Sequence, residues 1–261
     1  MLNEPTHPSE KNDLKSILSL RFERFDTSSP GAKSSLCEKA YLFWRQQWDQ
    51  TFQELQVDKQ NWSDDFLNRE LVGLFDNEEP VGLMLYRFLD LSRPSHRAVS
   101  YFHNYPPEVM AQVQAPRDTV QVPSHMTVNP NWTKTKTDYP ISELLISFCV
   151  LGFLENLQAQ RMLGYLRKNR STHSIFYRHG AIAVANDVQA YNVKVDFAII
   201  PRQTARLSTL TNCDQLALYF WNQQYNTIKR IYDYQPRPNK NINEAFGRQR
   251  SPNELGEHQF L

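Results

Sequence analysis

The stretch that decides the fold begins with VQVPSHMTV at residues 120–128 and continues with NPNWTKTKTD at residues 129–138. The first run predicts a strand, and the second predicts a loop rich in hydroxyl and amine groups. A very apolar helix is predicted to begin at Pro140 or Ile141. The first N–H groups of a helix have no internal partners, and the helix dipole favours an anion there. The loop and helix start therefore predict a phosphate-binding site.

The remaining elements predict an α/β fold with a mostly central sheet and helices on both faces. Downstream, the sequence predicts a strand at Met162–Arg167, a short helix closed by Gly180, strands at Ile182–Ala185 and Val193–Ile199, and a helix at Leu216–Tyr232. Upstream, it predicts a strand at Leu18–Phe22, a helix after a Ser35/Glu38 capping box, a short helix at Trp62–Leu67, and a hairpin of Leu71–Phe75 with Val81–Leu89. Between them, Ser92–Arg117 predicts an irregular excursion, either a substrate lid or an inert surface loop.

Composition limits the class of protein. The chain has 261 residues and a formal net charge of +1, so no strong overall field attracts nucleic acid or an anionic membrane. Three widely spaced cysteines and a polar start indicate a cytoplasmic protein with reduced thiols. The longest apolar run, residues 141–157, is interrupted by polar side chains and indicates a buried helix. We expect disorder over residues 1–13 and 235–261 and one domain over residues 14–234.

Two short motifs add to the evidence from the predicted order of strands and helices. The run FYRHG at residues 176–180 resembles the aromatic-Tyr-x-x-x-Gly pattern of the GNAT N-acyltransferases, one residue short. The run SHMTV at residues 124–128 resembles the Ser-Arg-apolar-x-Val strand of the acyl-homoserine-lactone and N-acyl amino acid synthases, a branch of that superfamily. Here His125 stands in place of the Arg, and Val122 stands where that branch has an acidic residue.

The resemblance covers roughly Leu18–Pro201 and implies a GNAT-like mixed central sheet with helices on both faces. In that fold the fourth and fifth strands, here Val120–Val128 and Met162–Arg167, splay apart and receive the pantetheine arm of the acyl donor. A tyrosine, here Tyr177, often protonates the leaving thiolate. The family's phosphate loop is usually rich in glycine, which this loop lacks. The residues expected to bind the donor are therefore Met126, Val128, Thr133, Lys134, Thr135, Lys136 and Thr137.

Amide formation from a thioester needs a neutral amine, a donor to the oxyanion and a proton for the thiolate. His125 can take the amine proton, although a lone histidine in a strand is more often structural. The N–H groups of Met126 and Val128 can polarise the carbonyl if a bulge opens the strand. Tyr177 supplies the proton in this reading; otherwise it is one of twelve packing or rim tyrosines. No histidine shows metal-ligand spacing, so no metal is expected.

The expected function is transfer of a medium or long acyl chain, from acyl-CoA or an acyl carrier protein, to the amine of an amino acid or small amine. Aromatic side chains on the helix at Leu36–Leu55 are core residues or the wall of an acyl tunnel. One alternative is a conventional acetyl-CoA-dependent N-acetyltransferase. The other is an inactive GNAT-shaped protein that binds a ligand or partner. We expect neither nucleic-acid binding nor integral membrane insertion.

Overall fold

The computed structural model describes residues 14–57, 66–133, 139–170, 172–190, 192–207 and 211–233. The chain divides into two compact units, Met1–Gln224 and Tyr225–Leu261, and the fold below is that of the first. The two segments predicted to be disordered lie outside the described residues. So do most of the predicted helix at Trp62–Leu67 and four loop residues, namely Lys134, Thr135, Lys136 and Thr137.

Among the described residues, seven strands form one mixed sheet in the order β1-β2-β3-β4-β5-β7-β6. The strands are β1 (Arg21–Asp26), β2 (Glu70–Asp76), β3 (Glu79–Asp90), β4 (Thr119–Val128), β5 (Ala159–Arg167), β6 (Ile182–Ala190) and β7 (Val193–Pro201). The helices are α1 (Leu14–Leu18), α2 (Ser34–Glu54), α3 (Pro94–Arg97), α4 (Pro107–Gln114), α5 (Ile141–Glu155), α6 (Thr172–Arg178) and α7 (Asn212–Asp233). Short 3₁₀ turns are η1 (Gly31–Lys33), η3 (Ser100–Phe102) and η4 (Pro130–Trp132).

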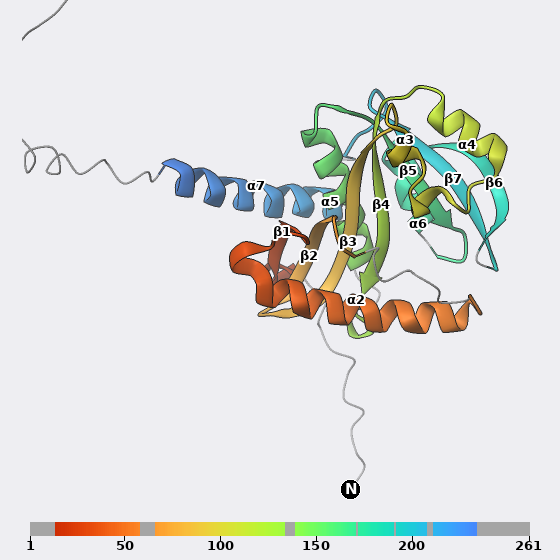
Figure 1. The fold of residues 1–261 in the computed structure, drawn as a ribbon. Coiled ribbons are helices and arrows are strands. Elements are labelled where there is room, and N and C mark those ends of the chain that lie inside the picture. The colour runs from red at the N-terminus through yellow and green to blue at the C-terminus, as the bar shows by residue number, and fades with distance from the viewer. Residues whose placement is uncertain are drawn as a thin grey trace, which may run out of the picture. The chain divides into compact units, whose positions relative to one another are not determined.

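Helices cover both faces of this sheet (Figure 1). Side chains of β3 alternate between the faces: Leu83 and Leu85 pack with α2, whereas Met84 and Tyr86 pack with α5. The helix α5 is the central element, because 11 of its 15 residues are buried. The predicted α/β class, with a mixed central sheet between helices, is confirmed.

The excursion at Ser92–Arg117 is ordered around α3, η3 and α4. Val109 and Val113 of α4 are almost fully buried and pack with Val120 and Leu163 of the sheet. The segment therefore covers the same face as α2, beside it. This packing corrects the expectation of a purely irregular loop.

Two predictions near the start of the chain were wrong. Leu18 ends the short helix α1, and the strand begins only at Arg21, since a helical turn buries Ile17 and Leu20 together. The Ser35/Glu38 capping box is absent, because α2 continues directly from the 3₁₀ turn η1. In its place the Ser34 hydroxyl donates a hydrogen bond to the Gly31 carbonyl over 2.7 Å.

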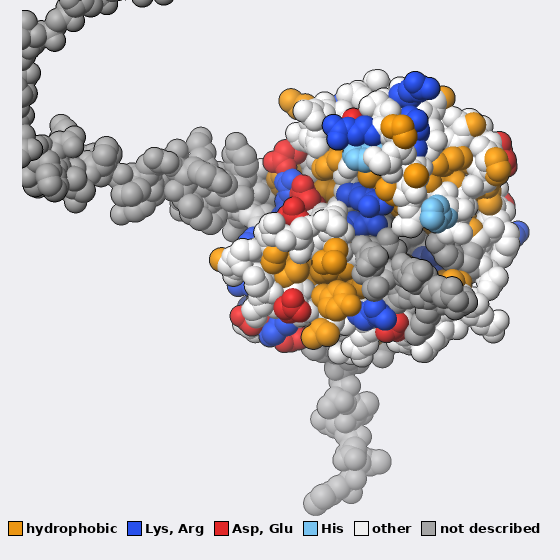
Figure 2. Space-filling model, viewed as in Figure 1, with side chains coloured by type: hydrophobic (Ala, Val, Ile, Leu, Met, Phe, Trp, Pro, Cys, Tyr) orange, Lys and Arg blue, Asp and Glu red, His pale blue; other side chains and the backbone are white. Residues whose placement is uncertain are grey.

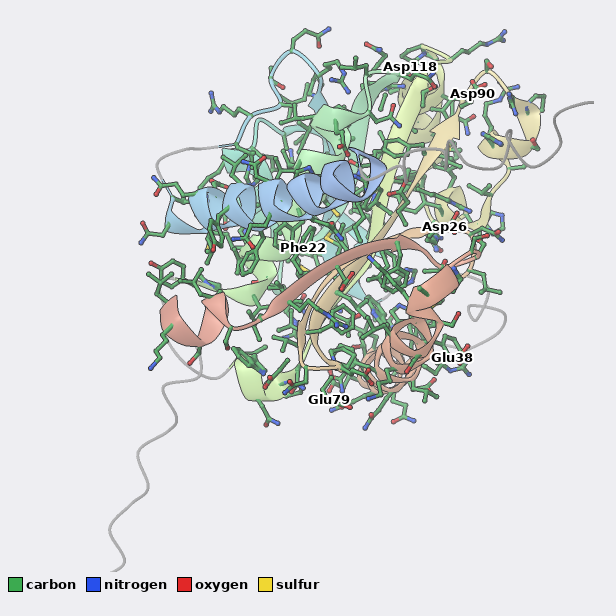
Figure 3. The ribbon with its side chains drawn as sticks, turned by 90° about the vertical axis from the view of Figure 1, so that its left-hand side faces the viewer. Phe22, Asp26, Glu38, Glu79, Asp90 and Asp118 are labelled. Atoms are coloured by element: carbon green, nitrogen blue, oxygen red, sulfur yellow. The ribbon has the colours of Figure 1, made fainter. Side chains whose placement is uncertain are left out.

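Aromatic contacts join the first strand, β1, to the helices α5 and α7. Phe22 of β1 lies between its strand and the last helix (Figure 3). Its ring centroid lies 4.2 Å from that of Phe148 on α5 and 5.7 Å from that of Trp221 on α7. All three cysteines are free and buried, as expected of reduced thiols. Within the described residues, no helix combines the length and the apolar character needed to cross a membrane.

Candidate active site

A wedge-shaped opening lies between β4 and β5. These strands are parallel and pair at only three positions, Thr119 with Ala159, Val120 with Arg161 and Gln121 with Met162. The pairing between the described residues stops there, although β4 continues to Val128 and β5 to Arg167. The two strands therefore separate toward their C-terminal ends, as the GNAT-like fold requires.

The far half of β4 carries a bulge. On the β3 side, Leu83 pairs with Thr127 and Leu85 pairs with Ser124, so His125 and Met126 lie opposite Met84 alone. His125 has a φ of +53°, the left-handed region that a bulge of this kind uses. The extra residue brings Ser124 and His125 to the same face, toward α2. The bulge that the role of Met126 and Val128 required as a condition is present at this point of β4.

The direction of the β4 backbone follows from one hydrogen bond. The Asn129 N–H donates to the Val81 carbonyl of β3 over 2.9 Å. Successive N–H groups of a strand point to opposite edges, so the Val128 N–H points away from β3 and into the opening. Met126 lies within the bulge, opposite Met84, so this alternation does not fix the direction of its N–H. The Val128 N–H can therefore donate a hydrogen bond to an oxygen held between the strands.

A cavity of about 670 Å³ fills the opening and extends to both faces of the sheet. This volume is within the usual range for small-molecule sites, roughly 300–1,000 Å³. Of the predicted site residues, it brings together His125, Met126, Val128 and Thr133. The other lining side chains include, from α2, Gln47, Trp48, Thr51 and Glu54; from α5, Ile141, Ser142 and Ile146; and from β5 onward, Tyr165, Leu166, Arg167, Arg170 and Phe176.

His125 is held edge-on between two tryptophans. Its ring centroid lies 5.6 Å from that of Trp44 and 4.8 Å from that of Trp48. Burial, followed by the charges of Arg69 and Arg87, lowers the pKa of His125 from 6.5 to about 3. His125 is therefore neutral at pH 7 and takes up a proton poorly. Its role as the base stays a prediction, with position in its favour and proton affinity against it.

Tyr177 has a different setting from the one expected. Its hydroxyl donates a hydrogen bond to Oδ2 of Asp196 on β7, over 3.0 Å. Burial and this carboxylate raise the pKa of Tyr177 to about 12. Asp196 is buried and also accepts from the Asp187 N–H over 3.0 Å. The cavity wall includes the neighbouring Phe176 and not Tyr177, so the structure does not bring Tyr177 and His125 together.

Sequence reasoning missed the charged groups of the cavity. Arg167 ends β5 and Arg170 follows it, whereas Glu54 ends α2 on the opposite wall. No local motif joins them, since only the fold brings these segments together. In Figure 2 basic and acidic side chains are mixed over the visible face, so the described residues of this face form no large patch of one charge. Among the described residues no cluster of His, Cys, Asp and Glu could hold a metal ion.

Comparisons with known proteins leave the family open. No family model and no curated protein matches the chain. Solved structures with some likeness include the CoA-dependent acyl-homoserine lactone synthase BjaI, at 13% identity over 71% of this chain and 85% of that one, with a TM-score of 0.49. The N-acyl amino acid synthase FeeM from uncultured soil microbes is 11% identical over 71% and 93%, with a TM-score of 0.46.

Another is ElaA from Escherichia coli, at 10% identity over 69% of this chain and 98% of that one, with a TM-score of 0.45. Because these values are low, we take the fold from the strand order, the splayed β4 and β5, and the bulge in β4. The strand order and the splayed strands are features that the GNAT resemblance predicts, and the GNAT-like fold is confirmed in this chain.

Proposed function

We propose that this protein is a GNAT-type N-acyltransferase that moves an acyl group from a thioester to the amine of an amino acid or small amine. The observation that carries the proposal is the cavity between the splayed β4 and β5, beside the bulge at His125. A cavity that crosses the sheet lets two substrates approach one reacting carbon from opposite faces. The cytoplasm, where acyl thioesters are made, is the expected compartment.

The α5 side suits the phosphate end of a thioester donor. The first turn of α5 lines the cavity with Ile141 and Ser142, and no side chain caps the helix at Pro140. In this turn the N–H groups of Glu143 and Leu144 both donate to the Pro140 carbonyl. The earlier N–H groups and the positive end of the helix dipole favour an anion. The expected partners Lys134 and Lys136 precede this helix start in sequence.

The reaction exchanges one bond for another. The amine nitrogen attacks the thioester carbonyl, the C–N bond forms, and the carbonyl oxygen gains negative charge. The N–H groups of Met126 and Val128 stabilise that oxygen. As the tetrahedral intermediate collapses, the C–S bond breaks. The amine gives up one proton and the thiolate takes one up, so the products are an amide and a free thiol.

The walls of the cavity favour an acyl chain longer than acetyl. Aliphatic and aromatic side chains come from both faces of the sheet and from the 3₁₀ turn η4, and they include Trp48, Met84, Met126, Trp132, Ile146, Leu166 and Phe176. Each methylene buried against such a wall contributes about 0.8 kcal/mol. The donor is therefore a medium or long acyl chain on CoA or on carrier protein.

Mass spectrometry of lipid extracts from cells that express this chain tests the proposal. We expect N-acyl amines that are absent from cells without it. A matched pair of α2 variants assigns them to the cavity. Thr51→Trp puts an indole into the cavity, whereas Gln53→Trp puts one on an exposed part of the same helix. The products should disappear with the first variant and persist with the second. Extracts without new N-acyl amines would argue against acyl transfer.

A further inference from the structure

The cavity contains a guanidinium group, that of Arg167, which forms no ion pair with a carboxylate of the described residues. Arg167 lines the wall and is partly buried, and its Nε donates a 3.3 Å hydrogen bond to the Asn169 side-chain oxygen. Within the described residues no carboxylate lies within ion-pair distance of it. Elsewhere in the fold, partly buried arginines such as Arg24 and Arg161 have carboxylate partners. A cation left in this state favours an anionic ligand.

The surroundings of Arg167 add to this imbalance. Burial and then the nearby charge of Arg170 lower the pKa of Arg167, because both destabilise its charged form relative to water. Arg170 is exposed at the edge of the same cavity. The opposite wall carries Glu54, whose carboxylate interacts with Arg167 through space and accepts a hydrogen bond from Gln50 over 3.2 Å. The cavity thus has a cation on one wall and an anion on the wall opposite.

The position of Arg167 assigns this pair to the acceptor and not to the donor. Side chains of β5 alternate, and Leu163 and Tyr165 lie on the face covered by α4, the face that α2 also covers, whereas Met162 and Leu166 pack with α5. By this alternation Arg167 points to the α2 face, opposite the first turn of α5. A dianionic phosphate there would be repelled by Glu54. A zwitterion matches both charges.

We propose that Arg167 and Glu54 form the acceptor subsite and that the acceptor is a free α-amino acid: Arg167 binds its carboxylate and Glu54 binds its amino group. This inference rests on the proposed function and adds the substrate class. The guanidinium fork matches a carboxylate in a two-bond geometry. Glu54 holds the amino group as ammonium and accepts the proton that it loses before attack. The amine then faces the bulge at His125.

Acylation of a matched pair of acceptors, phenylalanine and phenylalaninamide, tests the carboxylate contact. The wild-type protein should prefer the acid, and Arg167→Gln should reduce kcat/KM for the acid by about 10- to 100-fold, the usual effect of a lost charge-assisted hydrogen bond. The variant should change kcat/KM for the amide by less than about threefold. Arg93→Gln, at an exposed arginine on a different part of the surface, is the control and should keep the wild-type preference.

Binding measurements separate the possible failures. Trp48 and Trp132 line the cavity, so their fluorescence reports ligands without turnover. Phenylalanine should bind the wild-type protein, and Arg167→Gln and Glu54→Gln should each bind it at least tenfold more weakly. Equal losses for acid and amide would overturn the inference, as would weaker binding of CoA in place of phenylalanine, which would make Arg167 a phosphate contact. Acylation of non-carboxylate amines alone would overturn the inference and leave acyl transfer standing.

Discussion

Arg161 and Asp118 hold the closed end of the β4–β5 opening. Arg161 Nε lies 2.8 Å from Asp118 Oδ2, and Arg161 Nη2 also donates to the Val113 carbonyl of α4 over 2.8 Å. The two side chains are only 12% and 18% exposed. Asp118 stands immediately before β4, at the end of the sheet where Asp90 ends β3 (Figure 3). The strands are thus pinned where they pair and are free to separate beyond.

We expect Asp118→Asn to lower the free energy of unfolding by about 2 to 3 kcal/mol, because it leaves the Arg161 guanidinium partly buried without its anion. Urea denaturation of the two proteins measures this difference. Glu79→Gln removes a carboxylate from the exposed pair with Lys39 and is the control, with no measurable change expected. A stability loss no larger than that of the control would mean that this pair does not hold the strands.

The neutral state of His125 predicts an acid-sensitive fold. Its native pKa of about 3 lies below the ordinary 6.5, so between these values the unfolded chain binds a proton that the native chain does not. Stability should therefore fall as the pH falls from 6.5 toward 3. His125→Asn has no such group and suits the left-handed φ of +53°.

Below about pH 6, the wild-type protein should lose up to about 1.4 kcal/mol per pH unit more than His125→Asn. Unfolding by urea at a series of pH values measures both curves. His103→Asn, at an exposed histidine, should follow the wild-type curve. Parallel curves for the wild type and His125→Asn would show that His125 titrates normally in the fold.

The geometry of Tyr177 separates a structural role from an acid role. Tyr177→Phe removes the donor to Asp196 and should lower the free energy of unfolding by about 1 kcal/mol. Turnover should stay within about threefold of wild type, since the Tyr177 hydroxyl donates to Asp196 and Tyr177 does not line the cavity. The check is turnover under conditions where chemistry limits the rate. A fall of roughly ten- to a thousandfold, as expected for general-acid catalysis, would restore Tyr177 as the proton donor.

Much of the fold was predictable from the sequence, and four of the nine predicted site residues line the cavity. The run at 120–128 predicted β4, and the resemblance predicted its separation from β5, whereas the bulge was only a condition that the sequence does not show. The partners of single side chains were not predictable. Asp196 accepts the hydrogen bond from Tyr177 because strand alternation points the Asp196 side chain toward α6. Glu54 lines the cavity because α2 crosses the sheet. Local sequence patterns do not predict such contacts between segments that are far apart in the chain.

The central claim is acyl transfer from a thioester, and the most direct measurement uses the purified chain with a series of acyl donors on CoA and on carrier protein and an amino acid as acceptor. Mass spectrometry quantifies the N-acyl product, and a thiol reagent quantifies the released thiol. We predict one thiol for each amide, with donor affinity rising about fourfold for each added methylene that the cavity buries. A preference for acetyl donors would make the protein a conventional acetyltransferase. Donor binding with neither amide nor thiol, from any chain length, would contradict the claim.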